Sequence, residues 1–265
     1  MDTPETAEFL CDLEGTGVTL DPPPEPPLHL PRQTWVIEKK LSERAQWMTQ
    51  KDVDEGVGIS YAAAKFLCHP KENPTKKAFM RIYLQIPVSG TQYLSAEIRR
   101  KRAVKPRPHI ELTALKTLKE KGCDVVPDLL AYQDGKQGED GIVPGGYITY
   151  VVWDKVPGES LSPDEFWRLD FEARQAIRDK FREVFPKLTK HGFLPCMGSL
   201  SKIIFDKATG NMHLSGFSRA AHSEAIEEWD DKYYKLFHLA EPPKTVDPTK
   251  DTRLWTWPKA STGDT

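Results

Sequence analysis

Residues 191–220 read HGFLPCMGSLSKIIFDKATGNMHLSGFSRA. Within this stretch, the apolar run at residues 203–205, which is followed by Asp206, and the run at residues 212–215 flank the turn-forming residues 207–211. Short apolar and β-branched runs on either side of a turn that contains Gly and Asn are typical of a β-hairpin. We therefore expect a hairpin here, and its register fixes which residues stand before and after it.

This layout resembles the catalytic core of protein kinases, in which the loop H-R-D-L-x-x-x-N is followed by a short strand, a turn and the D-F-G strand. In the register of the hairpin, the His, Arg and Asp of the kinase loop correspond to Pro195, Cys196 and Met197. The metal-binding Asn corresponds to Lys202, and the D-F-G aspartate corresponds to Gly216. The resemblance implies a kinase-like fold in which none of these five positions keeps its kinase residue.

Phosphoryl transfer depends on Mg²⁺ ions held by the D-F-G Asp and the loop Asn, and on a loop Asp that accepts a proton. Met197, Lys202 and Gly216 can supply none of these groups. Two interpretations of Lys202 are open: its charge replaces part of the metal's charge and holds a nucleotide, or it is a solvated lysine, as most lysines are. Cys196 has two interpretations as well, a nucleophile or a small buried filler, and the second is the commoner case.

The segments upstream follow the order of kinase elements. Residues 108–122 have apolar residues at helical spacing and end on a glycine, which predicts a helix. By the resemblance, Glu111 on this helix takes the ion-pair position. Its implied partner is Arg81, which stands in the strand 78–84 where kinases have the ATP-binding Lys. Residues 55–61 resemble a glycine-rich phosphate loop that lacks its last glycine, but two glycines are a weak signal and an ordinary hairpin turn is the favoured interpretation.

Apolar, β-branched runs at residues 125–132 and 146–153 predict two further strands, and helices are expected from Ser162 and over residues 171–188. The resemblance implies an α+β class, a two-lobed protein-kinase-like fold with a truncated C-terminal lobe. We expect four parts: a disordered Pro-rich tail (1–32), an N-lobe with an antiparallel sheet and a helix (33–153), a reduced helical C-lobe (154–240) and a tail (241–265). In the last part, Trp255 and Trp257 suggest docking onto the body or onto a partner.

Composition sets limits on the function. The chain has 265 residues, of which 38% are hydrophobic and 29% charged, with a net charge of −2, which is typical of a globular protein. It contains no apolar run long enough to span a bilayer, and its N-terminus is acidic, so we expect a cytoplasmic protein without a membrane partner. The four cysteines show no paired spacing, which argues against a disulfide framework or a zinc site. We expect no metal and no cofactor.

Basic residues are concentrated in one short segment. They are Arg99, Arg100, Lys101, Arg102, Lys105 and Arg107. Such a cluster is able to follow a phosphate backbone, in a salt-sensitive way that does not depend on base sequence. The alternative is a solvated basic loop, as most basic runs are.

Two adjacent carboxylates, Asp230 and Asp231, form the second candidate site. They lie in the run 223–239, which begins with Ser and acids and carries an apolar stripe, so a helix is expected there. One interpretation makes them surface acids, with Asp231 paired to Lys235 one turn on. In the other, they hold a guanidinium in a forked geometry or take a proton from an amine.

Asp230, Asp231 and Tyr234 also resemble, in part, the Asp-Asp-x-x-Glu motif of fungal proteins that make arginine-containing cyclic dipeptides from arginyl-tRNA and a second aminoacyl-tRNA. Tyr234 stands where that motif has Glu. The resemblance implies a synthase of secondary metabolism, with Asp230 and Asp231 as catalytic residues and with tRNA bound by the basic cluster. The alternative is a non-catalytic pseudokinase that works as a binding or scaffold protein with a protein partner. A small-molecule kinase does not fit Met197, Lys202 and Gly216.

Overall fold

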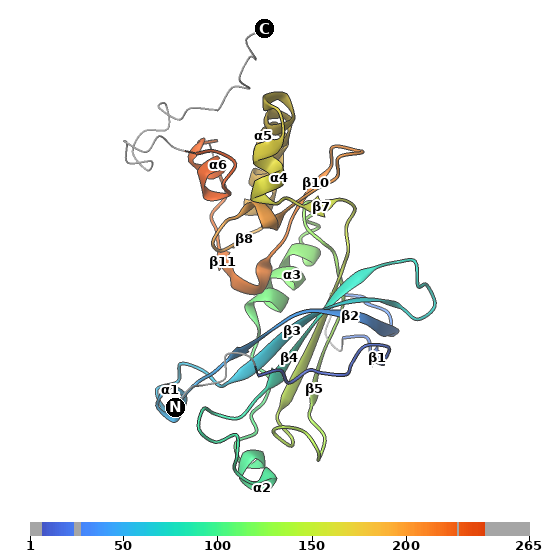
Figure 1. The fold of residues 1–265 in the computed structure, drawn as a ribbon, viewed down its shortest axis with the longest axis vertical. Helices are drawn as coiled ribbons and strands as arrows, with labels where there is room; N and C mark the ends of the chain where they lie inside the picture. The colour runs from blue at the N-terminus through green and yellow to red at the C-terminus, as the bar shows by residue number, and fades with distance from the viewer. Residues whose placement is uncertain (1–6, 24–27, 227, 242–265) are drawn as a thin grey trace. The chain divides into compact units, whose positions relative to one another are not determined.

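The computed structural model describes residues 7–23, 28–226 and 228–241. The chain divides into two compact units (Figure 1). The first consists of Met1–Pro108 with Leu129–Lys155, and the second of His109–Asp128 with Val156–Thr265. Helices and antiparallel strands are both present, so the expected mixture of the two is confirmed. None of the helices in the described part of the chain combines the length and apolar character that a bilayer crossing requires.

The first unit is built on a six-stranded antiparallel sheet. In sheet order its strands are β1 (Gly17–Leu20), β2 (Gln33–Gln46), β3 (Tyr61–Pro70), β4 (Ala78–Gln85), β6 (Tyr147–Asp154) and β5 (Leu129–Lys136). Two short helices lie in its connections, α1 (Gln50–Asp54) between β2 and β3 and α2 (Ala96–Arg100) after β4. The two strands predicted from residues 125–132 and 146–153 correspond to β5 and β6, which pair with each other.

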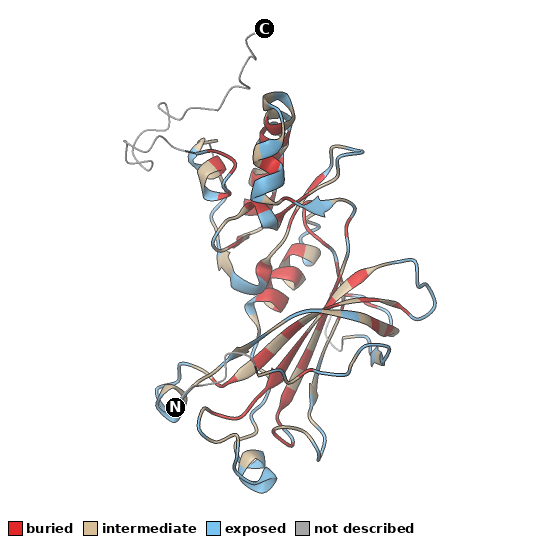
Figure 2. Ribbon diagram, in the orientation of Figure 1, coloured by how far each residue is buried: buried red, intermediate tan, exposed pale blue. Residues whose placement is uncertain are grey.

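Buried and less buried residues alternate most regularly along β3 of this sheet, and Figure 2 shows burial along the strands. In β3 every second residue is buried, and Ala64, Phe66 and Cys68 are fully enclosed. This period of two arises because successive side chains of a strand point to opposite faces. Met80 and Ile82 of β4 belong to the same core cluster, so one face of the sheet carries the hydrophobic core of the unit.

The N-terminal residues correct one expectation. The prolines of residues 1–32 predicted a disordered tail, but residues 17–20 form β1 and pair with residues 33–36 of β2. Ahead of β1, the backbone N–H of Phe9 donates to the Glu43 carboxylate at 2.6 Å, and Gly15 N donates to Ile37 O at 2.8 Å. Any segment that can adopt an extended conformation can pair through its main chain with an edge strand. For this reason, the composition of residues 1–32 did not predict the pairing of β1 with β2.

The second unit is mainly helical, with three small β-pairs. Its elements are α3 (Ile110–Glu120), β7 (Glu159–Ser160), α4 (Pro163–Arg168), α5 (Phe171–Thr189), β8 (Phe193–Pro195), the 3₁₀ helix η1 (Leu200–Lys202), β9 (Ile203–Phe205), β10 (Met212–Leu214), the 3₁₀ helix η2 (Phe217–Arg219), β11 (Ala220–His222) and α6 (Lys232–Leu236). The helices predicted over residues 108–122 and 171–188 are confirmed as α3 and α5.

The division between the units differs from the expected one at α3. The sequence placed this helix in the N-lobe, 33–153, but it belongs to the second unit. The reason lies in its contacts, because α3 packs against η2 and β11, and Leu214 N donates to Val125 O just after the helix at 2.8 Å. A helix that connects two strands of one sheet can still bury its apolar face in the other unit of the chain.

The predicted helix over residues 223–239 is wrong for most of its length. Only Lys232–Leu236 is helical. The Ser223 hydroxyl, expected to cap a helix, donates instead to the carbonyl of Glu224 at 2.9 Å. Residues 223–226 continue irregularly from β11. Local hydrogen bonds of this kind compete with helix formation. The acids of this segment predicted the start of a helix, but no helix begins at residues 223–226.

Candidate functional site

The β9–β10 hairpin is present in the second unit as expected. Ile203 faces Leu214 and Phe205 faces Met212 in antiparallel register. The turn is fixed by Asp206, whose carboxylate accepts from Ala208 N at 2.9 Å and from the Thr209 hydroxyl at 2.7 Å. The hydrogen bond from Thr209 is the largest cause that lowers the pKa of Asp206, and that from Ala208 N comes next. Asp206 is therefore a turn-forming residue.

The hairpin brings Lys202 and Gly216 together, as the register predicted. Ser215 N donates to Lys202 O at 2.8 Å, which places the two strand ends side by side. A Cβ built on Gly216 would lie 3.0 to 3.2 Å from Cγ, Cδ and Cε of Lys202. The side chain of Lys202 thus crosses the position from which a side chain at Gly216 would extend.

Lys202 reaches further, and its ammonium group donates to the carbonyl of Cys196. Burial is the largest cause that lowers the pKa of Lys202, and Arg219 lowers it further. Lys202 is half-buried and hydrogen-bonded, so the interpretation as a solvated surface lysine is wrong. Its amino group ties residue 202 to the loop at residues 195–198.

That loop carries no carboxylate. Met197 has a φ of 55° and is 74% exposed, and the guanidinium of Arg219 contacts its sulfur at 3.9 Å. Cys196 is half-buried, and its backbone N–H donates to Arg219 O at 2.7 Å. At Gly198, an added Cβ would lie 2.3 Å from Leu236 O, so the loop packs directly on the backbone of α6. Within the described residues, no group of three or more His, Cys, Asp or Glu side chains could hold a metal ion.

Arg81 and Glu111 belong to different units. Arg81 lies on β4 between Lys65 and Val151, with its guanidinium 5.6 Å from the ring of Trp153. Glu111 lies in the first turn of α3 and is 3% exposed. The ion pair between them stays a prediction. Residues 55–60 connect α1 to β3, with Gly56 at a φ of 74°, which fits the turn interpretation of this glycine-containing segment.

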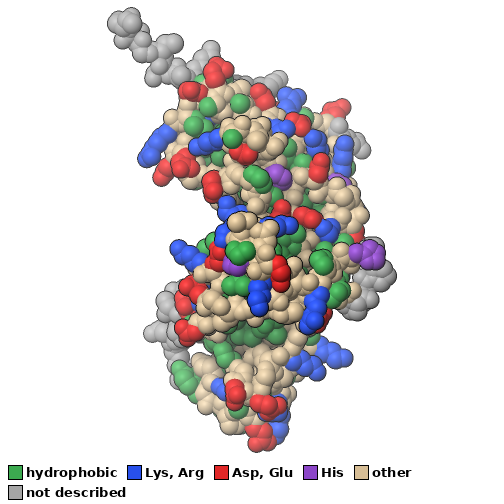
Figure 3. All heavy atoms as spheres, turned by 90° about the vertical axis from the view of Figure 1, so that its right-hand side faces the viewer, with side chains coloured by type: hydrophobic (Ala, Val, Ile, Leu, Met, Phe, Trp, Pro, Cys, Tyr) green, Lys and Arg blue, Asp and Glu red, His purple; other side chains and the backbone are tan. Residues whose placement is uncertain are grey.

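The basic cluster lies in the first unit, on α2 and the segment after it. Several of its members have local partners: Arg99 donates to Gln92 O at 3.1 Å, Arg100 pairs with Glu139, and Arg102 donates to Gln50 Oε1 at 2.9 Å. Lys101 lies 3.6 Å from Glu97, and Lys105 and Arg107 are exposed. Figure 3 shows Lys and Arg interspersed with Asp and Glu over the displayed face of the molecule, in keeping with the net charge of −2.

Asp230 and Asp231 lie in the second unit, beside α6. Asp230 accepts from Lys232 N at 2.8 Å and pairs with the Lys232 ammonium at 3.2 Å. The hydrogen bond from Lys232 N is the largest cause that lowers the pKa of Asp230. Asp231 accepts from the indole N–H of Trp229 at 2.8 Å, so the expected pair with Lys235 is replaced by this bond. Tyr234, at the Glu position of the motif, is buried.

These residues border an aromatic cluster that the sequence did not reveal. Phe181 and Phe185 of α5 stack at 5.1 Å between centroids, Phe181 lies 4.9 Å from Phe237, and Trp229 lies 5.0 Å from Tyr234. The guanidinium of Arg182 lies 5.7 Å from the Trp229 ring. An arginine of the chain itself thus already occupies a face of the aromatic ring next to the acids.

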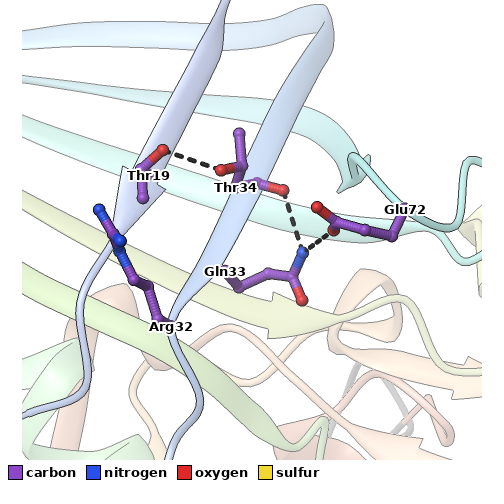
Figure 4. A pocket seen from close by; sticks show the side chains of 5 residues that line it. All are labelled: Thr19, Arg32, Gln33, Thr34 and Glu72. Atoms are coloured by element: carbon purple, nitrogen blue, oxygen red, sulfur yellow. Dashed lines mark hydrogen bonds between the residues drawn. The ribbon is translucent and has the colours of Figure 1, made fainter.

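The structure also contains a pocket that sequence reasoning missed. It lies on the first unit and is lined by Thr19, Arg32, Gln33, Thr34 and Glu72 (Figure 4). The lining groups bond to one another, Thr19 to Thr34 at 2.8 Å and Gln33 to Glu72 at 2.5 Å. These residues come from β1, from β2 with the residue before it and from the turn after β3, so no short motif could have indicated the pocket.

No protein-family model matches this chain, and a comparison with curated proteins found no match. Among solved structures, the chain is similar to the kinase PK-1 of Cydia pomonella granulovirus. The two sequences are 14% identical, the TM-score is 0.42, and the match covers 74% of this chain. It spans 55% of the viral kinase, about half of that protein's length.

Proposed function

We propose that this chain has a two-lobed kinase-like fold, has lost phosphoryl transfer, and acts by binding a protein partner. The observation that carries the proposal is the side chain of Lys202, which runs across Gly216 and donates to the carbonyl of Cys196. These residues stand where a kinase holds its metal ions. Mg²⁺ takes oxygen ligands, and neither a lysine nor a glycine side chain provides one.

The loss extends beyond the two missing ligands. Gly216 has a φ of 91°, where an Asp would be strained, and its Cβ would meet the chain of Lys202. Met197 stands at the position of the catalytic base and has only a thioether. The metal ligands and the catalytic base are therefore missing at the same time. The function we propose for such a fold is the binding of a protein partner.

The proposal predicts that the purified chain does not cleave ATP. ADP release should stay at the level of buffer with or without Mg²⁺, because Lys202 and Gly216 cannot hold the metal and Met197 cannot accept a proton. The measurement compares the parent chain with Lys202→Ala and with Lys207→Ala, which removes an exposed lysine of the same hairpin. Mg²⁺-dependent ADP release that disappears in Lys202→Ala and persists in Lys207→Ala would contradict the proposal and make Lys202 a catalytic residue.

A second candidate is the tRNA-dependent synthesis of an arginine-containing cyclic dipeptide. The observation that favours it is Asp230, whose side chain is 41% exposed and whose lowered pKa keeps it in the anionic form that pairs with a guanidinium. In this candidate, the Asp230 carboxylate holds the arginyl guanidinium or takes the proton from its α-amine. The amine attacks the ester carbonyl of the second aminoacyl-tRNA and releases one tRNA, and ring closure by the second amine releases the other. Positioning two activated esters requires no nucleophile from the protein. Arg99, Arg100, Lys101, Arg102, Lys105 and Arg107 would contact the tRNA.

The second candidate predicts a new arginine-containing cyclic dipeptide in cells that express the chain, detected by mass spectrometry. Asp230→Ala should abolish the product, and Asp231→Ala should reduce it, since Asp231 is engaged by Trp229. Glu224→Ala, which removes an exposed acid of the same segment, serves as the control and should leave the product unchanged. Absence of any product from folded protein, or a product that survives Asp230→Ala, would eliminate this candidate.

A further inference from the structure

The segment that follows β4 exposes an unusual amount of apolar surface. Four of the exposed large hydrophobic side chains in the described residues lie between residues 93 and 104: Tyr93 at 89%, Leu94 at 38%, Ile98 at 41% and Val104 at 38%. Figure 1 shows α2, which carries Ile98, beyond the ends of the strands of its unit. Single exposed hydrophobic residues are ordinary, whereas four within twelve positions make this segment a candidate contact surface.

The fold holds this segment in place. Gln85 at the end of β4 is 1% exposed, and its side chain accepts from Val104 N at 3.0 Å and donates to Arg102 O at 2.8 Å. Gln137 in turn donates to Gln85 O at 2.8 Å. Ser95 caps α2 by accepting from Ile98 N at 3.4 Å. Hydrogen bonds with Gln85 thus anchor the end of the segment, residues 102–104, to the sheet, and Ser95 fixes the start of α2.

The same segment is strongly basic. Residues 93–107 contain six Lys or Arg and one acid, Glu97. Arg100 is paired with Glu139, but no acid of the described residues pairs with Lys105 or Arg107. A surface that combines exposed aliphatic groups with an excess of positive charge is complementary to a partner with an anionic surface layer and an apolar interior.

We propose that residues 93–107 bind the surface of a membrane that contains anionic lipids. Tyr93, Leu94 and Ile98 enter the boundary between headgroups and acyl chains, while Lys105 and Arg107 contact lipid phosphates or carboxylates. The aliphatic side chains distinguish this partner from RNA, because Leu94, Ile98 and Val104 can neither stack on bases nor pair with phosphates. This proposal departs from the expectation of no membrane partner, which rested on the lack of a spanning apolar run, because binding at the membrane surface needs no such run.

The test is co-sedimentation of the full chain with two kinds of vesicle, phosphatidylcholine alone and phosphatidylcholine mixed with phosphatidylserine. The parent chain should bind the anionic vesicles, with an affinity that falls as salt rises. Lys105→Glu combined with Arg107→Glu should weaken this binding about tenfold or more. Tyr93→Ser combined with Ile98→Ser should weaken it to a similar extent, because apolar insertion contributes together with charge.

Two control variants test whether the location matters. Leu41→Ser removes an exposed hydrophobic residue of β2, and Lys207→Glu reverses an exposed charge elsewhere, and both should bind anionic vesicles like the parent chain. Binding that is unaffected by Tyr93→Ser with Ile98→Ser overturns the proposal, since charge alone would then account for it. No binding to anionic vesicles, together with retention of a single-stranded RNA oligonucleotide that depends on Lys105 and Arg107, overturns it in favour of nucleic acid.

Discussion

Gly158→Ala is expected to lower the free energy of unfolding by about 3–4 kcal/mol, since it adds backbone strain to a steric clash. Gly158 has a φ of 96°, which side chains with a Cβ rarely adopt. A Cβ there would lie 2.7 Å from the carbonyl carbon and oxygen of Phe205 and from Asp206 N. All three atoms belong to the backbone of the β9–β10 hairpin and cannot rotate away. Equilibrium urea unfolding followed by circular dichroism measures the effect.

Gly210→Ala is the matched control for this change. Gly210 lies in the turn of the same hairpin at a φ of 72°, and nothing approaches its position within 4 Å. It should therefore cost only the strain of a left-handed conformation, about 1–2 kcal/mol. The difference between the two variants isolates the close approach of Gly158 to Phe205. Equal losses in both would mean that the hairpin moves aside without cost and that the packing of β7 against β9 is loose.

The hairpin is the part of the candidate site that local sequence predicts best. Its strands and turn follow from apolar runs and turn residues, and the register then requires that Lys202 and Gly216 lie together, as they do. The hydrogen bond from Lys202 to the Cys196 carbonyl could not be predicted in the same way. It depends on the path of residues 195–198, which is set by Gly198 against Leu236, a contact between residues 38 positions apart.

The segment around Asp230 and Asp231 shows the limit of periodicity. Acids and an apolar stripe predicted one long helix, but the structure forms five helical residues there. Aromatic side chains of this segment pack against α5 instead. Phe181 of α5 contacts the rings of Trp229, Tyr234 and Phe237. Tertiary packing of aromatic side chains outweighs a helix propensity that amounts to a few tenths of a kcal/mol per residue.

The apolar face of α5 was predicted, but two charged residues on that face were not. Arg174 and Arg178 are 6% and 0% exposed. Arg174 donates to the carbonyls of Trp167 and Leu169 at 3.1 and 3.0 Å, and Arg178 Nε donates to Leu239 O at 2.8 Å. Burial is the largest cause that lowers the pKa of Arg178, to about 10. A charged residue in a sequence usually indicates exposure. The sequence pattern therefore did not predict that Arg174 and Arg178 are buried and bond to the carbonyls of other segments.

Arg178→Ala is expected to lower the free energy of unfolding by about 3–4 kcal/mol, because it leaves a cavity in a closed site and removes the donor from Leu239 O. Arg178→Met keeps most of the volume and removes the buried charge, so it should cost about 1–2 kcal/mol. Arg182→Ala, one turn on and exposed, should cost less than about 1 kcal/mol. Urea unfolding of the four proteins measures this order. If Arg178→Ala lost no more stability than Arg182→Ala, the hydrogen bond to Leu239 O would not be what holds the segment after α6 against α5. It would then not fix the position of Asp230 or of the loop at Gly198 either.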